Sequence, residues 1–188
     1  MTSIIKVDEI QNKAGTSAFD IRSNGIVNNK VPCGFSVGLV NATDQTGIPT
    51  NTYTKAEYVK TNVDHAFDTH NGWSDTDHTY TVPTNCGGYW LLNVWAEFDR
   101  ASETNIVTIT RGTTVSNTNA FHYVRGVHVS NPQNASNPTP NIQFVVSLPD
   151  GQAIHTQVYH TYGSNATLLA PDAGDDYLRC GMQGWRLF

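Results

Sequence analysis

The sequence carries little charge and no long apolar run. Only 14% of its 188 residues are charged, and the net charge is −5. The sequence contains no run of Lys or Arg that could bind a phosphate backbone, so nucleic acid is not an expected partner. No stretch approaches the roughly 18 apolar residues of a membrane span, which argues against membrane insertion. The start lacks a basic segment followed by an apolar one, so we expect synthesis in the cytoplasm without a signal peptide.

Motifs of known enzyme chemistry are also missing. The sequence has no G-x-S-x-G, no H-E-x-x-H and no G-x-x-x-x-G-K-[ST]. We therefore predict a protein that is not an enzyme and holds no cofactor, with a carboxylate-based polysaccharide depolymerase as the alternative. The three cysteines, Cys33, Cys86 and Cys180, lack metal-type spacing. In a reducing compartment this pattern favours buried free thiols, and a single disulfide is the alternative.

What the sequence does contain is Thr and Asn, at 23 and 18 residues. Thr favours strands and Asn favours tight turns, so the composition suits a β protein. Short runs rich in β-branched and aromatic residues recur after residue 33, separated by Gly, Pro, Asn or Asp, which predicts an all-β, antiparallel two-sheet sandwich. Two stretches, 55–60 and 165–170, could form helical turns. The expected strands are 34–40, 79–83, 88–98, 105–112, 121–129, 142–149, 152–162 and 180–188.

The run from Tyr89 to Phe98 is apolar on both of its alternating faces. One face carries Tyr89, Leu91 and Trp95, and the other carries Trp90 and Leu92. A sandwich strand needs only one apolar face, so something must also cover the second one. Exposed aromatic groups would make an adhesive patch, which favours self-association. A central strand lying under a long loop is the alternative.

We expect a domain boundary near residue 32. Before it, short β segments alternate with turns and are too small to bury a core by themselves. We therefore divide the chain into an N-terminal leader, 1–32, and a head domain, 33–188. The leader needs a partner, either the same leader on other chains or another protein.

Four stretches in order resemble the trimeric jelly roll shared by the globular heads of complement's first component and by tumour necrosis factor. They are Tyr80-Thr81-Val82-Pro83, Gly88-Tyr89-Trp90-Leu91, 148–154 and 182–187. Leu91 stands where that family has Phe, and Asp150 and Gly151 come in reversed order. The resemblance covers about residues 33–188.

The resemblance implies a homotrimeric jelly-roll head. It places the strands at 89–98, 152–160 and 180–188 in one inner sheet whose outward side meets two other subunits. It therefore implies a set of interface candidates: Tyr89, Leu91, Trp95, His155, Tyr159, Trp185 and Phe188.

The leader resembles the openings of virion proteins of tailed bacteriophages, especially tail-fibre-like proteins. This resemblance implies a virion structural protein, assembled in the host cytoplasm, whose leader attaches to other virion proteins. The head would act in capsid or particle decoration, or in host attachment through a surface glycan or protein. Its apical loops would be 41–62, 112–120 and 130–141. An extracellular ligand similar to tumour necrosis factor is an alternative.

Two acidic segments are weak candidates for Ca²⁺ binding through carboxylates. The first, 64–78, contains Asp64 and Asp68 together with three histidines. It fits neither a zinc pattern nor the calcium-loop pattern, so a solvated loop is the favoured interpretation. The second is the turn with Asp172, Asp175 and Asp176, where the resemblance implies an occasional calcium site.

Overall fold

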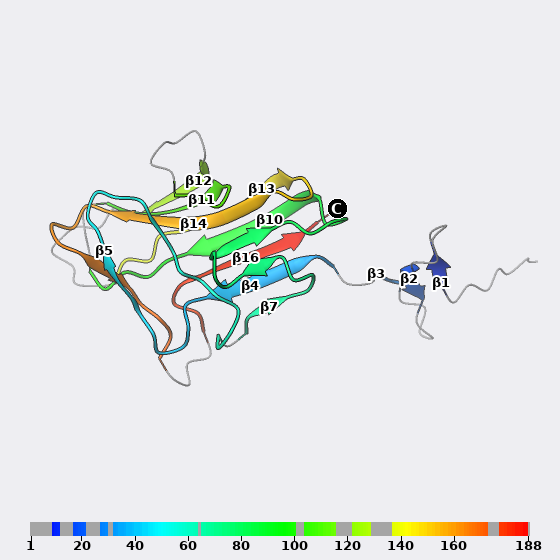
Figure 1. The fold of residues 1–188 in the computed structure, drawn as a ribbon, viewed down its shortest axis with the longest axis horizontal. Coiled ribbons are helices and arrows are strands. Elements are labelled where there is room, and N and C mark those ends of the chain that lie inside the picture. Colours follow the sequence, from blue (N-terminus) through cyan, green and yellow to red (C-terminus); the bar gives the residue numbers. More distant parts are fainter. Residues whose placement is uncertain are drawn as a thin grey trace, which may run out of the picture. The chain divides into compact units, whose positions relative to one another are not determined.

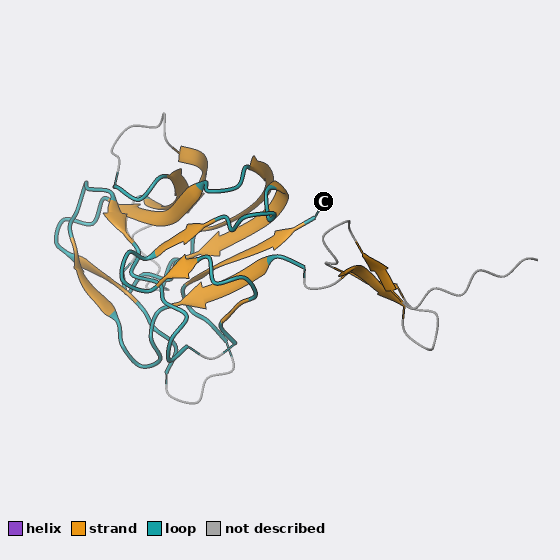
Figure 2. Ribbon diagram, turned by 45° about the vertical axis from the view of Figure 1, so that its right-hand side comes forward, coloured by secondary structure: helices purple, strands orange, loops and turns teal. Residues whose placement is uncertain are grey.

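A computed structural model describes residues 9–11, 17–21, 27–29, 32–63, 65–100, 104–115, 122–128, 137–172 and 177–187. The chain separates into two compact units, residues 1–32 and 33–188. All regular elements in the described residues are strands (Figure 2). The described part contains no helix long and apolar enough to cross a membrane.

The N-terminal unit is a small antiparallel sheet. Its strands are β1 (Glu9–Gln11), β2 (Ser17–Ile21) and β3 (Val27–Asn29), in the order β1-β2-β3. Such a sheet has too few residues to enclose a core of its own.

The head unit contains two antiparallel sheets (Figure 1). The first, which we call the front sheet, has the order β13-β10-β16-β4-β7. Its strands are β13 (Asn141–Leu148), β10 (Gly88–Trp95), β16 (Gly181–Arg186), β4 (Gly34–Gly38) and β7 (Phe67–Asp68).

The second, which we call the back sheet, has the order β12-β11-β14-β9-β8, and a short strand β6 also pairs with β14. Its strands are β12 (His122–His128), β11 (Asn105–Arg111), β14 (Ala153–His160), β9 (Thr79–Thr81), β8 (Trp73–Ser74) and β6 (Thr54–Lys55). Two further strands, β5 (Gln45–Ile48) and β15 (Ala166–Leu168), pair at one end of the head.

An aromatic cluster joins the two sheets. Phe35 of β4 stacks on Tyr80 of β9 with ring centroids 3.9 Å apart, and Trp90 meets Tyr80 edge-on at 5.6 Å. The ring centroid of Trp73 of β8 lies 6.0 Å from that of Phe35. Aromatic pairs at these separations add to the stabilisation from apolar burial. The core therefore sits between the sheets, and it binds the front sheet to the back sheet.

Strand β10 follows the predicted alternation. Trp90, Leu92 and Val94 have no exposed surface, whereas Tyr89 and Leu91, on the other face, remain partly or largely exposed. Side chains alternate across a strand, so one face of β10 belongs to the core and the other to the outside. All eight predicted strands are present. The predicted helical turns at 55–60 and 165–170 are wrong, because Lys55 pairs with β14 and Ala166–Leu168 pairs with β5.

Tight turns carry the abundant asparagines. Asn51, Asn62, Asn71 and Asn85 all have φ near +60°, a conformation that Asn adopts more readily than most residues. Asn is therefore used here to reverse the chain between short strands.

Candidate functional site

The outward face of the front sheet carries a cluster of large apolar side chains. Tyr89 is 48% exposed, Val145 is 53% exposed and Trp185 is 40% exposed. They stand on three adjacent strands, β10, β13 and β16. Scattered apolar residues on a surface are ordinary, but a contiguous set on one face indicates a contact surface.

The strand register brings these side chains together. Leu91 lies opposite Val145 on one side and opposite Trp185 on the other. The Trp185 ring packs against Phe67 of β7, with centroids 4.8 Å apart. Directly opposed residues on one face of a sheet are in side-chain contact. We call Tyr89, Leu91, Val145, Trp185 and Phe67 the apolar patch.

Polar residues occupy the rest of this face. Asn93 lies opposite Gln143 and Gln183, and the Gln183 side-chain amide donates to Ser36 Oγ at 3.2 Å. Trp95 is only partly exposed, because its indole lies over Gly181 and Nε1 donates to Leu178 O at 2.8 Å. The apolar patch therefore ends at Asn93, and Trp95 is fixed within its own subunit.

Past the end of β10, Glu97 Oε1 accepts a hydrogen bond from Arg179 Nη2 at 2.6 Å. This hydrogen bond raises the pKa of Arg179 above its usual value, against the opposing effect of burial. The Glu97–Arg179 ion pair therefore lies at the end of the front sheet's outward face, beyond the apolar patch.

The predicted interface residues fall on both sheets, and one of them lies outside the described part. Tyr89, Leu91, Trp95 and Trp185 share the outward face of the front sheet. Phe188 lies outside the described residues. The sheet assignment of 152–160 is wrong, because β14 pairs with β11 and β9 in the back sheet. It therefore shares no sheet with β10 and β16.

The two candidates on β14 have partners within the subunit. His155 has no exposed surface in the single chain, and its Nδ1 lies 2.8 Å from Gly112 O. Tyr159 donates a hydrogen bond from its hydroxyl to Asn51 Oδ1 at 3.2 Å, and its ring lies 5.0 Å from that of Tyr53. Burial removes His155 from the set of residues that a neighbouring subunit could contact.

In the first acidic segment, the described carboxylates close turns. Asp68 accepts hydrogen bonds from Trp73 N at 2.8 Å and from His70 N at 3.3 Å, and Lys60 Nζ lies 3.7 Å away. Asp75 accepts hydrogen bonds from Lys60 N and Thr61 Oγ1. Burial opposes ionisation of Asp75, but these hydrogen bonds outweigh it and hold its pKa below the usual value. Their oxygens are already used, as expected for structural carboxylates.

Of the remaining calcium candidates, Asp172 is exposed. Asp64, Asp175 and Asp176 lie outside the described residues. Among the residues that the structure describes, one group of potential metal ligands comes together, and it contains no aspartate: Cys33, His70 and Cys86.

The favoured interpretation of free thiols is wrong for two of the three cysteines, and the structure has the alternative, a single disulfide. Cys33 and Cys86 form a disulfide across a sequence separation of 53. Cys180 is a buried free thiol, as predicted, and burial raises its pKa to about 12.

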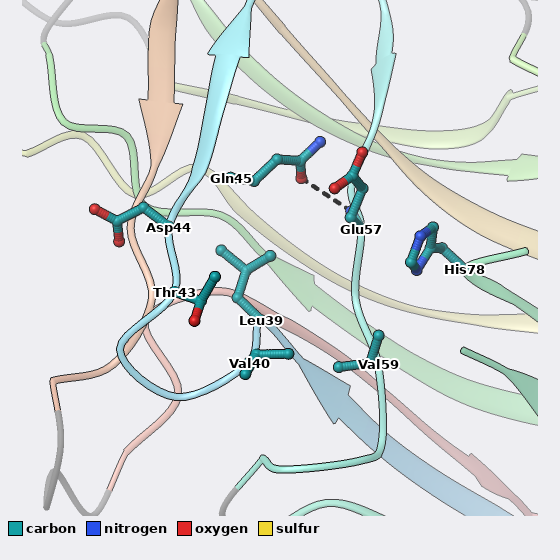
Figure 3. Close-up of a pocket in the computed structure, with 8 residues that line it drawn as sticks. All are labelled: Leu39, Val40, Thr43, Asp44, Gln45, Glu57, Val59 and His78. Carbon is teal, nitrogen blue, oxygen red and sulfur yellow. Dashed lines mark hydrogen bonds between the residues drawn. The ribbon is translucent and has the colours of Figure 1, made fainter. Parts of the chain in front are cut away.

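A small hollow of about 180 Å³ opens beside the end of β4 (Figure 3). The side-chain amide of Gln45 spans its rim, donating from Nε2 to Lys55 O and accepting from Glu57 N, each at 2.9 Å. Ligand pockets usually hold about 300 to 1,000 Å³, so this hollow is too small for a typical substrate. Its lining residues are Leu39, Val40, Thr43, Asp44, Gln45, Glu57, Val59 and His78.

No known protein family and no curated protein matches the sequence. Among solved structures, murine APRIL at pH 5.0 is similar with a TM-score of 0.56 and 13% identity, over 84% of this chain and 100% of that chain. Eiger TNF from S. frugiperda is similar with a TM-score of 0.57 and 10% identity, over 84% and 94%. The globular domain of zebrafish complement 1qA has a TM-score of 0.48 and 8% identity, over 84% and 98%.

Identities this low show a shared fold and nothing more. The predicted all-β, two-sheet jelly roll is confirmed. The predicted trimer, virion role and leader attachment stay predictions.

Proposed function

We propose that the head assembles as a homotrimer through the apolar patch and acts as a binding module without enzymatic activity. The observation that carries this proposal is the set of exposed Tyr89, Val145 and Trp185 side chains around Leu91. Covering a half-exposed side chain of this size stabilises an assembly by about 1 kcal/mol, so the patch from three subunits contributes substantially. Aromatic residues are enriched in such contacts.

Threefold assembly is favoured over a dimer by the fold. The resemblance to the complement and tumour necrosis factor heads implies three subunits that meet through this same sheet. The structural similarity to Eiger TNF supports that resemblance at the level of the fold. Trimers also suit weak surface contacts, because linked sites raise the effective affinity without any new chemistry.

The finer role that we propose is a phage fibre or decoration head, held to the particle by residues 1–32. Its support is the resemblance of the leader to phage virion proteins and its separate small sheet. Of the suggested apical loops, 41–62 contains strands β5 and β6, and residues 116–120 and 130–136 lie outside the described part.

A second candidate is an extracellular ligand similar to tumour necrosis factor. The Cys33–Cys86 disulfide favours it, because such bridges are typical of proteins that work outside the cell. Binding of labelled protein separates the two roles. A virion head binds particles that lack it or the bacterial host, whereas a signalling ligand binds animal cells and neither of the former.

Analytical ultracentrifugation at micromolar concentration tests the assembly. We expect the native chain to sediment at three times its 20.6 kDa mass. Val145→Asp places a charge in the patch, so this variant should sediment as a folded monomer. Val115→Asp is the matched control, because Val115 is 39% exposed and lies outside the patch, and it should remain trimeric. A monomeric native chain, or a trimeric Val145→Asp variant, would contradict the proposal.

A further inference from the structure

Three side chains that are remote in sequence converge at one end of the front sheet. Cys33 precedes β4, His70 lies in the turn between β7 and β8, and Cys86 precedes β10. Their two sulfurs and one ring nitrogen all lie within 4.8 Å of one another, and His70 Nε2 is 3.9 Å from Cys33 Sγ. A disulfide by itself needs no histidine at this distance.

The Thr69 hydroxyl contacts both Gly34 and the His70 ring. Thr69 Oγ1 accepts from Gly34 N at 2.9 Å and donates its one hydrogen to Gly34 O at 3.1 Å. His70 Nδ1 lies 2.8 Å from the same oxygen, and when the Thr69 hydroxyl donates to Gly34 O, Nδ1 carries the proton and donates it to Thr69 Oγ1. The lone pair of Nε2 then faces the sulfurs. Metal-binding histidines are commonly oriented in this way, by a hydrogen bond at the nitrogen that does not touch the metal.

We propose that Cys33, Cys86 and His70 form a binding site for a thiophilic divalent cation of the Zn²⁺ type when the disulfide is reduced, with a water in the fourth position. Two thiolates and one imidazole are a donor set that Zn²⁺ prefers. Around a tetrahedral Zn²⁺, with its usual bond lengths to sulfur and nitrogen, the ligand atoms lie about 3.5 to 3.8 Å apart. Once the disulfide is open, rotation about the Cα–Cβ bonds of the two cysteines moves the sulfurs apart toward this spacing.

The reduced and oxidised states exclude each other. Opening the Cys33–Cys86 bond takes two electrons and two protons, which a dithiol supplies while its own sulfurs become a disulfide. The cation then displaces the two thiol protons, so the thiolates and the cation form a neutral unit. Neutrality matters because Cys33 is 5% exposed and Cys86 is 1% exposed, and burying net charge is costly. His70 is partly exposed and provides the way in for the cation and the water.

Both cysteine segments are held in place by bonds that reduction does not touch. Asp150 accepts hydrogen bonds from Asn85 N and Gly87 N, on either side of Cys86. Trp90 Nε1 donates to Cys86 O at 3.1 Å, and Arg186 N donates to Cys33 O at 2.9 Å. The thiols therefore remain close together after the bridge opens, which a metal site requires.

Cobalt binding tests the proposal. The Cys180→Ser chain, which keeps only the two relevant thiols, is reduced with a phosphine, freed of reductant without oxygen and titrated with Co²⁺. We expect one equivalent to produce thiolate charge-transfer absorption in the near ultraviolet and intense visible bands of tetrahedral cobalt. One equivalent of Zn²⁺ should abolish both the charge-transfer absorption and the visible cobalt bands. The oxidised chain should show neither signal.

Two further variants assign the nitrogen ligand. His70→Ala should weaken Co²⁺ binding at least tenfold and shift the visible bands, and Thr69→Val should weaken it about 10- to 100-fold through the loss of ring orientation. Tryptophan fluorescence verifies that each reduced variant is folded. The proposal is wrong if the folded, reduced chain gives no saturable charge-transfer band. It is also wrong if folded His70→Ala binds Co²⁺ with unchanged affinity and spectrum.

Discussion

Adding one methyl group at Gly184 should destabilise the head strongly. A Cβ at this position would lie 2.9 Å from Leu92 Cδ2 and even closer to the ring of Phe35. Neither side chain has any exposed surface, so neither can move into solvent. Overpacking of a core costs about 1 to 3 kcal/mol, and we expect the upper end of that range for Gly184→Ala. For a chain of this size, about 3 kcal/mol corresponds to a fall in Tm of about 6 to 12 °C.

Gly34→Ala gives the comparison on the opposite face of the same sheet. A Cβ there would meet the Trp185 ring, which is 40% exposed and can swing outward. We expect a cost of about 1 kcal/mol or less for the subunit, together with a weakened trimer. Gly163→Ala is the control, because nothing lies within 4 Å of a Cβ there, and it should stay within about 0.5 kcal/mol of the native chain.

Urea unfolding followed by tryptophan fluorescence measures these differences, with Val145→Asp as the background so that assembly does not contribute. Phe35→Leu should make Gly184→Ala less costly, because it creates the space that the methyl group needs. A coupling of about 1 kcal/mol or more is expected for residues in contact. Equal stability of Gly184→Ala and Gly163→Ala would refute the packing argument, as would the absence of coupling to Phe35→Leu.

Two further predictions concern the turn that contains Cys86. Reduction of the Cys33–Cys86 bridge, whose cysteines are 53 residues apart, should lower the free energy of unfolding by about 4 kcal/mol, because the unfolded chain gains entropy. Urea titration with and without reductant measures this difference. A chain with both Cys33→Ala and Cys86→Ala must not respond to reductant. Hydrogen bonds from Asn85 N and Gly87 N hold the pKa of Asp150 below its usual value. The ionised carboxylate therefore stabilises the fold above about pH 4, and this stabilisation is lost as the pH falls through the pKa of Asp150 in the folded state. Asp150→Asn should therefore lower the urea midpoint at pH 7 but much less at pH 3, and an equal loss at both values would contradict the assignment.

The strand positions followed from the sequence because they depend on local pattern. The alternation in residues 89–98 separated the two faces of β10, and the structure buries the face with Trp90 and Leu92. The short strands β5, β6, β7, β8 and β15 were missed, since two to four residues are too few to show a period. Sheet membership is not local either. The family resemblance assigned strand β14 to the wrong sheet, and local pattern could not correct it, because the partners of β14, β9 and β11, lie more than 40 residues away in the chain.

The cysteine site could not be predicted from local sequence patterns either, because its residues lie far apart in the chain. Cys33, His70 and Cys86 have no motif spacing, and they come together through the pairing of β4 with β7 and of β16 with both β4 and β10. The expectation of a reducing compartment also weighed against a disulfide. Cys33 and Cys86 stand just before β4 and β10, but the sequence did not assign residues 34–40 and 89–98 to one sheet.

The bridge and the apolar patch lie at the same end of the front sheet, which raises the question of whether the trimer depends on the disulfide. Cys33 and Cys86 precede β4 and β10, the two strands that flank β16 and therefore Trp185. The register of these strands is also fixed by backbone pairing along their lengths and by the donation from Leu187 N to Tyr89 O at 2.8 Å. We therefore expect the reduced chain to sediment as a trimer at micromolar concentration. If the reduced subunits stay folded but dissociate, the disulfide positions the apolar patch and the backbone pairing of the strands does not.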